Sequence, residues 1–144
     1  MSDIARVSPE EASALLSDGG YIYVDVRTES EFEAGHPPGA LNVPFMLRGP
    51  AGLVPNAEFV SVMEAAFDKE AHLLLGCQSG GRSRKAATAL AAAGFSGLQE
   101  LRTGWDGSRD AFGRLEPGWS KASLPVETGL PDGQKYSDVR GLRR

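Results

Sequence analysis

Cysteine, long apolar runs and excess positive charge are all scarce in this sequence. Its 144 residues include one cysteine, Cys77, which excludes an internal disulfide and a zinc site of the usual cysteine-rich kind. No apolar run approaches the roughly 20 residues of a membrane-spanning helix, and the first residues lack the basic-then-apolar pattern of a secretory signal. A net charge of -4 gives no general attraction to nucleic acid or anionic lipid. We therefore expect a soluble intracellular protein without a membrane or nucleic-acid partner.

The remaining composition is that of a globular domain, with 41% hydrophobic and 24% charged residues. A chain of this length can bury a core without disulfides or metals. The last residues, Thr128 to Arg144, are polar and contain few apolar side chains, so we expect a frayed or surface-wrapped tail. The predicted organisation is one domain over residues 1–127 and a polar tail over residues 128–144.

Helix and strand signals alternate along the predicted domain. Ser8 and Thr28 each begin a capping box, and the two helices that follow are expected to end at Gly19 and Gly35. Further helices are predicted from about residue 56 to residue 67 and over residues 82–93, and strands over residues 21–26, 41–45, 72–76 and 98–101. This alternation predicts an α/β fold, in which helices cover both faces of a central, mainly parallel sheet.

The loop CQSGGRS, residues 77–83, joins a predicted buried strand to a predicted helix. Ligand sites in open α/β sheets favour this carboxyl edge of the strands. Gly80 and Gly81 can adopt backbone angles closed to other residues, so successive N–H groups can turn inward and form an anion-binding nest. The helix N-terminus adds positive potential at the same place. A thiol there should lose its proton more easily than a free cysteine, which predicts that Cys77 is a nucleophile at neutral pH.

Arg82 is the one cation inside this loop, and its planar guanidinium group suits an oxyanion such as sulfonate, sulfate or phosphate. Ser83 can add a hydroxyl donor to the sulfur. The alternative is that Cys77 is a packed apolar residue and Arg82 a surface residue, because free cysteines are commonly buried. The strand, glycine-rich loop and helix in succession favour the functional interpretation.

Two segments together resemble the rhodanese homology family, and more closely its single-domain members of the plant and bacterial kind. They are VDVRTESEFEAGHPPGALNVPF over residues 24–45 and LLLGCQSGGRSRKAATALAAAGF over residues 73–95. A weaker match is LPVE over residues 124–127. The resemblance covers roughly residues 8–127 and implies a single rhodanese-like domain.

The resemblance implies a two-step transfer of sulfur. The Cys77 thiolate attacks the outer sulfur of a small anionic donor, thiosulfate rather than 3-mercaptopyruvate, and becomes a persulfide. Cyanide or a thiol acceptor, such as a thioredoxin-like protein or glutathione, then removes that sulfur. No cofactor or metal is implied. The compartment stays open between the cytoplasm and an organelle interior such as the chloroplast stroma.

The resemblance also implies roles for residues around the nucleophile. The backbone of residues 78–83, that is Gln78, Ser79, Gly80, Gly81, Arg82 and Ser83, would cradle the terminal sulfur or the donor anion. Arg82 would orient this loop or hold the anion. Asp25 and Arg27 are expected to brace the loop, and His36 is expected to be a structural hydrogen-bonding residue rather than a base.

The sequence departs from the family pattern at Pro37, where isoleucine is usual, and in the stretch from Thr103 to Trp119, which looks lengthened. The lengthened stretch is expected near the site and leaves the donor preference open. Trp105 and Trp119 are expected to pack in the core or at the rim, because aromatic side chains dominate buried area.

Two other functions compete with the sulfurtransferase. A persulfide relay, or a module that binds a partner without turning over small donors, would keep the same residues. A phosphatase or arsenate reductase is less favoured, because such enzymes use a Cys-x5-Arg loop whereas four residues separate Cys77 from Arg82 here. A phosphatase also needs a general acid, for which Asp106 is a weak candidate.

Overall fold

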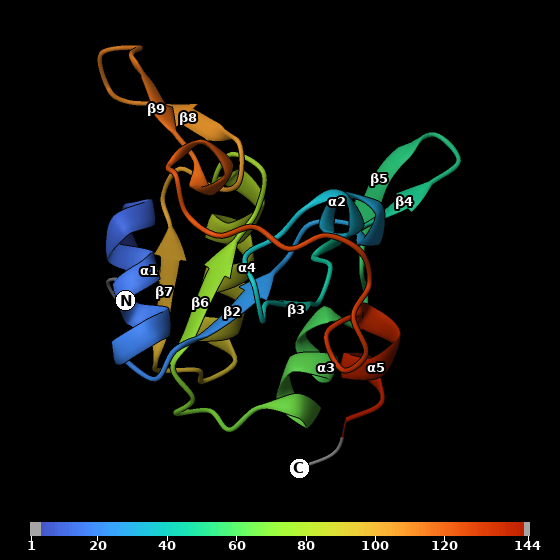
Figure 1. Ribbon diagram of the computed structural model, residues 1–144. Helices are drawn as coiled ribbons and strands as arrows, with labels where there is room; N and C mark the ends of the chain where they lie inside the picture. The colour runs from blue at the N-terminus through green and yellow to red at the C-terminus, as the bar shows by residue number, and fades with distance from the viewer. Residues whose placement is uncertain (1–3, 143–144) are drawn as a thin grey trace.

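A five-stranded parallel sheet forms the centre of the computed structural model, which describes residues 4–142 (Figure 1). The first three residues of the predicted domain and the last two of the predicted tail lie outside the described residues. The strand order is β1-β7-β6-β2-β3, and every pairing within this sheet is parallel. The strands are β1 (Ala5–Val7), β2 (Ile22–Asp25), β3 (Leu41–Asn42), β6 (Leu73–Gly76) and β7 (Leu98–Leu101). The predicted mainly parallel sheet is confirmed.

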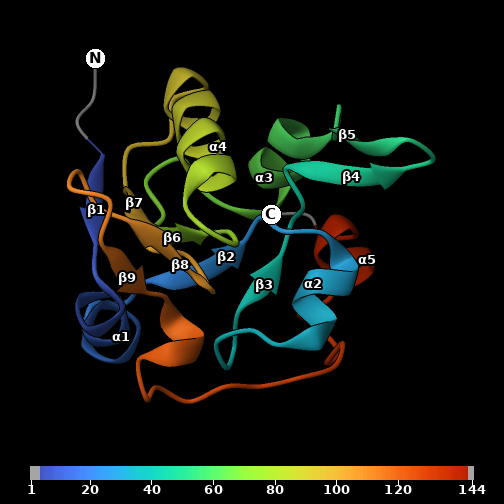
Figure 2. The same cartoon turned by 90° about the horizontal axis from the view of Figure 1, so that it is seen from above.

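Helices cover both faces of this sheet, as predicted. Seen from above, α3 and α4 lie on one side of the sheet and α1 on the other (Figure 2). The helices are α1 (Pro9–Asp18), α2 (Glu29–Ala34), α3 (Phe59–Ala66), α4 (Gly81–Ala92) and α5 (Tyr136–Arg140). Complete capping boxes at Ser8 and Thr28 begin α1 and α2, so local sequence fixes where these two helices start.

The central strands divide their side chains between two cores. Leu73 and Leu75 of β6 pack with α3 and α4, whereas Leu74 between them packs with α1. This alternation follows from the two-residue period of a strand. All three leucines are fully buried, and each such burial contributes roughly 1.5–3 kcal/mol. β6 is therefore firmly held where it delivers the loop that follows it.

Two antiparallel hairpins lie outside the central sheet. One consists of β4 (Met46–Gly49) and β5 (Gly52–Pro55), and the other of β8 (Gly107–Arg109) and β9 (Leu115–Pro117). Figure 1 shows both projecting at the end of the sheet to which the central strands point. The predicted strand over residues 41–45 stops at Asn42, and Pro44 beyond it has no N–H to donate.

The C-terminal residues correct one expectation. Tyr136 and Val139 of α5 are buried in the core against α3, so the prediction of a frayed or surface-wrapped tail is wrong for this part of the chain. Asn42 of the edge strand β3 donates its N–H to the Gln134 carbonyl at 2.9 Å, which covers part of that edge. The polar composition of residues 128–144 gave no sign that the side chains of Tyr136 and Val139 pack in the core. The tail belongs to the same domain.

Within residues 4–142, no helix has both the length and the apolar character required to cross a membrane.

Candidate active site

Cys77 follows the last residue of β6, Gly76, and begins the loop predicted to carry the chemistry. Its side chain borders a cavity of about 350 Å³. The Gly80 N–H donates to Cys77 Sγ at 3.1 Å, and Ser83 Oγ lies 3.6 Å from the same sulfur. The loop therefore bends around the sulfur and offers it a backbone donor and a hydroxyl group, as an inward-turned nest would.

Glycine is required at only one of the two loop positions. Gly80 has a φ of 101°, and a Cβ atom there would lie 2.7 Å from the Arg102 carbonyl oxygen. A Cβ atom at Gly81 would meet nothing within 4 Å. The close turn that aims the Gly80 N–H at sulfur thus depends on the absence of a side chain at residue 80.

The start of the lengthened stretch holds the base of the loop. Trp105 and Asp106 donate their backbone N–H groups to the carbonyls of Cys77 and Gln78, at 2.7 and 2.9 Å. Gly104, with a φ of 67°, allows this approach, because a Cβ atom there would lie 2.6 Å from the Gln78 carbonyl oxygen. Trp119 is buried in the core on the α1 side, and Trp105 is partly buried against it.

Arg82 points to α2 rather than standing free. Its Nη1 and Nη2 donate to the two carboxylate oxygens of Glu31 at 2.8 and 2.9 Å. Burial raises the pKa of Glu31, but hydrogen bonds from Arg82 and Thr28 outweigh it and lower that pKa to about 2. Glu31 also closes the capping box of α2. Of the two roles expected for Arg82, this paired geometry favours orientation of the loop.

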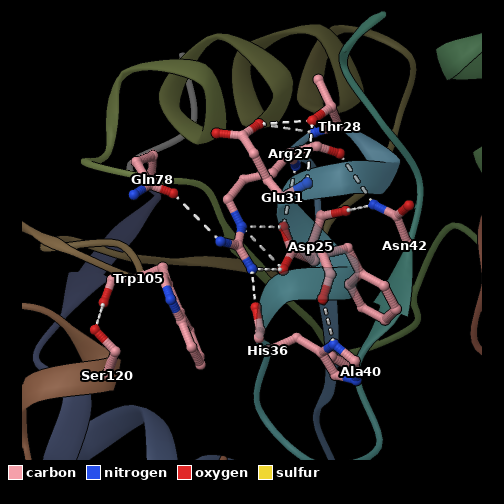
Figure 3. A network of polar contacts seen from close by, with 12 residues as sticks. Asp25, Arg27, Thr28, Glu31, His36, Ala40, Asn42, Gln78, Trp105 and Ser120 are labelled. Carbon is pink, nitrogen blue, oxygen red and sulfur yellow. Dashed lines mark hydrogen bonds and ion pairs between the residues drawn. The ribbon is translucent and has the colours of Figure 1, made fainter. Parts of the chain in front are cut away.

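Asp25 and Arg27 form a buried pair beside the loop, shown in Figure 3. Arg27 is 2% exposed, and its Nε and Nη2 donate to Asp25 at 3.0 and 2.7 Å. Arg27 Nη1 donates to Gln78 Oε1 at 3.2 Å, and its guanidinium group lies 5.0 Å from the centre of the Trp105 ring. The pair thus connects the end of β2 to the loop. Sequence reasoning did not single out Asn42, whose side chain donates to the carbonyls of both Asp25 and Arg27.

His36 is fully buried, and both of its ring nitrogens contact oxygen atoms. Its Nδ1 lies 2.7 Å from the Phe32 carbonyl and its Nε2 lies 3.0 Å from Glu127 Oε1, while its ring stacks on Phe32. Glu127 ends the LPVE segment, so the histidine turn and the segment near the end of the chain are in contact. The structure brings together Cys77, residues 78–83, Asp25 and Arg27, and connects the turn of His36 to Arg27 through the Gly35 carbonyl, which accepts from Arg27 Nη2 at 2.6 Å.

The wall of the Cys77 cavity includes residues that sequence reasoning missed. Lys85 adds a second cation, three residues after Arg82 on α4. Helical spacing could have revealed it, because residues three apart share a face. The remaining wall is largely apolar and comes from the segment before β4 and from the β4–β5 hairpin, through Phe45, Met46 and Leu53. In the described part of the chain no carboxylate borders this cavity, and Asp106 instead pairs with Lys121 at 3.2 Å.

Glu100 of β7 is the other residue that was missed. Its carboxylate accepts a hydrogen bond from Ser83 Oγ at 3.2 Å and lies 3.5 Å from Arg6 Nε. Glu100 is 3% exposed, and burial raises its pKa above the ordinary value despite the neighbouring Arg6. Ser83 thus stands between a buried carboxylate and the sulfur. The only signal in the sequence for a role of Glu100 was an acidic residue inside the predicted strand LQEL.

Comparison with known proteins agrees with this geometry. The Rhodanese-like domain model matches residues 8–111. The chain is 36% identical over 130 residues to Thiosulfate sulfurtransferase 16, chloroplastic, of Arabidopsis thaliana, covering 88% of this chain and 99% of that relative. It is 39% identical over 128 residues to Thiosulfate sulfurtransferase 18 of the same plant, covering 88% and 85%.

Among solved structures, the crystal structure of Rv0390 from M. tuberculosis superposes with a TM-score of 0.71 at 26% identity. The match covers 89% of this chain and all of that one. The family model covers well over half of the sequence, and the plant relatives match along nearly their whole length. This chain belongs to the rhodanese-like domain family.

Proposed function

We propose that the protein is a sulfurtransferase that moves a sulfane sulfur from thiosulfate or a related donor to cyanide or a thiol, through a Cys77 persulfide. The observation that supports this most is the sulfur atom itself. Cys77 is fully buried and borders a cavity, its sulfur lies 3.1 Å from the Gly80 N–H that donates to it, and the chain has no second thiol to attack that sulfur. The names of the two plant relatives support the same activity.

The proposed chemistry has two displacement steps. The Cys77 thiolate attacks the outer sulfur of thiosulfate, the sulfur–sulfur bond of the donor breaks, and sulfite leaves with the electron pair. Cyanide or an acceptor thiolate then attacks the outer sulfur of the persulfide and takes it, which restores the Cys77 thiolate. The charge of the persulfide lies on its outer sulfur, one bond beyond Cys77 Sγ, where N–H groups of the loop that surrounds Sγ would stabilise it.

The lining of the cavity supports this reaction over phosphate hydrolysis. Sulfite leaves as an anion and needs no proton, whereas an alkoxide leaving group needs a general acid. No described carboxylate borders the Cys77 cavity. Lys85 supplies a positive charge for the donor while Arg82 is held by Glu31. This division supports Lys85 as the residue that attracts a dianionic donor.

The apolar wall favours a second candidate for the acceptor step, a persulfide relay to a protein. Leu53 on the β4–β5 hairpin is 44% exposed and lies next to the cavity. Cyanide needs no such surface, but a thioredoxin-like protein would cover it, and glutathione would cover it in part. In a strict relay, sulfur would leave Cys77 for the protein acceptor and not for a small molecule.

The decisive experiment follows the mass of the protein. The parent chain and Cys77→Ser are incubated with thiosulfate, their intact masses are recorded, and cyanide is then added. We expect the parent alone to gain one sulfur atom and to lose it as thiocyanate. Absence of this gain with thiosulfate and with 3-mercaptopyruvate would overturn the enzyme proposal. Sulfur that leaves for a thioredoxin-like acceptor, but not for cyanide or glutathione, would identify the relay.

A further inference from the structure

A second cavity, of about 500 Å³, lies against the other side of the catalytic loop. Ser79 and Gly81 border both cavities, but Cys77 borders only the first. The hairpin β8–β9, which belongs to the lengthened stretch, forms much of the remaining wall. A volume of this size is within the range of about 300–1,000 Å³ that is usual for small-molecule sites.

Arginine dominates this second cavity. Four arginines from four parts of the chain surround it, in a protein whose net charge is -4: Arg6, Arg84, Arg102 and Arg109. Two carboxylates also border it, and both are engaged. Glu116 pairs with Arg102 at 3.2 Å, and Asp110 accepts hydrogen bonds from its own hairpin, at the backbone N–H groups of Phe112 and Arg114. The cavity therefore carries an excess of positive charge.

Two of these arginines have guanidinium N–H groups that can donate further hydrogen bonds to a ligand. Among residues 4–142, the Arg84 side chain makes no hydrogen bond or ion pair, and Arg109 donates one bond, to the Gly113 carbonyl. Planar guanidinium groups bind phosphate and carboxylate groups through paired hydrogen bonds. Several such groups around one hollow fit a ligand that carries more than one anionic group.

We propose that this arginine cavity, bordered by Arg6, Arg84, Arg102 and Arg109, binds a small organic polyanion with two or more phosphate or carboxylate groups. The ligand is distinct from the sulfur donor, because Cys77 does not border this cavity. It is nevertheless linked to the loop. Arg6 lies 3.4 Å from the Gly80 carbonyl and 3.5 Å from Glu100, which in turn contacts Ser83.

Two adjacent residues of α4 provide the test. Arg84 borders the arginine cavity and Lys85 borders the Cys77 cavity, so Arg84→Gln and Lys85→Gln remove the same charge from opposite sides of the loop. Binding of pyrophosphate and of citrate is measured by calorimetry for the parent and both variants. We expect Arg84→Gln to weaken binding at least about tenfold, as loss of a charge-assisted bond does, and Lys85→Gln to change it less than about twofold.

Each outcome decides the proposal. No binding of either probe, equal weakening by both variants, or weakening by Lys85→Gln alone would overturn it. Binding of pyrophosphate but not of citrate would identify a phosphate ligand. Binding of citrate but not of pyrophosphate would identify a carboxylate ligand. These measurements need no sulfur donor. Failure of the proposed sulfur transfer would therefore not contradict the proposal that the arginine cavity binds a polyanion.

The link to the loop has its own measurement. A polyanion that binds Arg6 competes with the Gly80 carbonyl for that arginine, and so disturbs the residue whose N–H donates to Cys77 Sγ. Pyrophosphate should therefore slow the alkylation of Cys77 by iodoacetamide in the parent and not in Arg84→Gln. An alkylation rate that pyrophosphate leaves unchanged in the parent would overturn the link.

Discussion

The two hairpins beside the Cys77 loop, residues 77–83, have opposite chemical characters. The β4–β5 hairpin presents Met46 and Leu53 to the cavity that contains Cys77. The β8–β9 hairpin presents Arg109 and Glu116 to a cavity that excludes Cys77. Both are antiparallel pairs that take no part in the central sheet. The fold therefore provides one loop with two separate environments, one mainly apolar and one mainly cationic.

This difference suggests separate roles for the two hairpins in the proposed sulfur transfer. The parallel sheet and the Asp25–Arg27 pair position the sulfur, and neither hairpin contributes to them. Exposed hairpin residues such as Leu53 can vary without disturbing the core, whereas Leu47 of β4 packs against it. We infer that the choice of acceptor lies with β4–β5 and that any response to soluble anions lies with β8–β9.

The largest effect on sulfur transfer and anion binding is expected from a substitution at Gly80, which borders the arginine cavity and donates its N–H to Cys77 Sγ. Gly80→Ala would place a Cβ atom 2.7 Å from the Arg102 carbonyl and force a positive φ on alanine, so the loop must move on both sides. We expect sulfur transfer to fall at least about 100-fold, as misplacement of about 1 Å can do, and anion binding to weaken with it. Persulfide formation and calorimetry measure the two effects.

Gly81→Ala is the matched control, since its Cβ atom would meet nothing within 4 Å. We expect it to retain activity within about threefold, because the backbone need not move. Equal losses in both variants would show that flexibility of the loop, and not the close turn at residue 80, is what sulfur transfer requires.

A smaller effect is expected from the link between the loop and α2. Glu31→Gln removes the charge that holds Arg82 and should cost about 1–2 kcal/mol of unfolding free energy at pH 7. The folded pKa of Glu31 is about 2, below the ordinary 4.5, so its contribution is present above pH 4.5 and is lost as the pH falls towards 2. Denaturant titrations at pH 7 and pH 3 should show the difference between parent and variant shrinking.

Glu29→Gln on the same turn serves as the control, because Glu29 is exposed and makes no hydrogen bond among the described side chains. It should cost less than about 0.5 kcal/mol at either pH. Anion binding should survive Glu31→Gln, because Glu31 and Arg82 do not border the arginine cavity. A difference that stayed constant between pH 7 and pH 3 would show that the charge of Glu31 is not what stabilises the fold.

Local signals in the sequence predicted much of this structure. Capping boxes at Ser8 and Thr28 mark helix starts by their own hydrogen bonds, and the glycine-rich loop after an apolar strand marks the site. The short β1 and the docking of Tyr136 depend on partners far along the chain, which a local pattern does not contain. The two hairpins pair nearby residues, such as Gly49 with Gly52, but sequence reasoning did not identify them. Glu100 was missed because its contact with Ser83 is brought about only by the fold. Lys85 was within reach of a local argument, since it lies three residues after Arg82 on α4.

The smallest effect compares the hairpins directly. Leu53→Ser on β5 removes apolar surface beside the Cys77 cavity, whereas Leu115→Ser on β9 removes surface that is 63% exposed and borders neither cavity. If a protein acceptor covers β4–β5, Leu53→Ser should slow transfer to a thioredoxin-like protein by about three- to tenfold, since loss of one buried leucine contact costs about 1 kcal/mol. Transfer to cyanide should not change, and Leu115→Ser should affect neither acceptor. Equal rates for parent and Leu53→Ser with the protein acceptor would remove the acceptor role from β4–β5, and the apolar character of that hairpin would then serve only to enclose the donor.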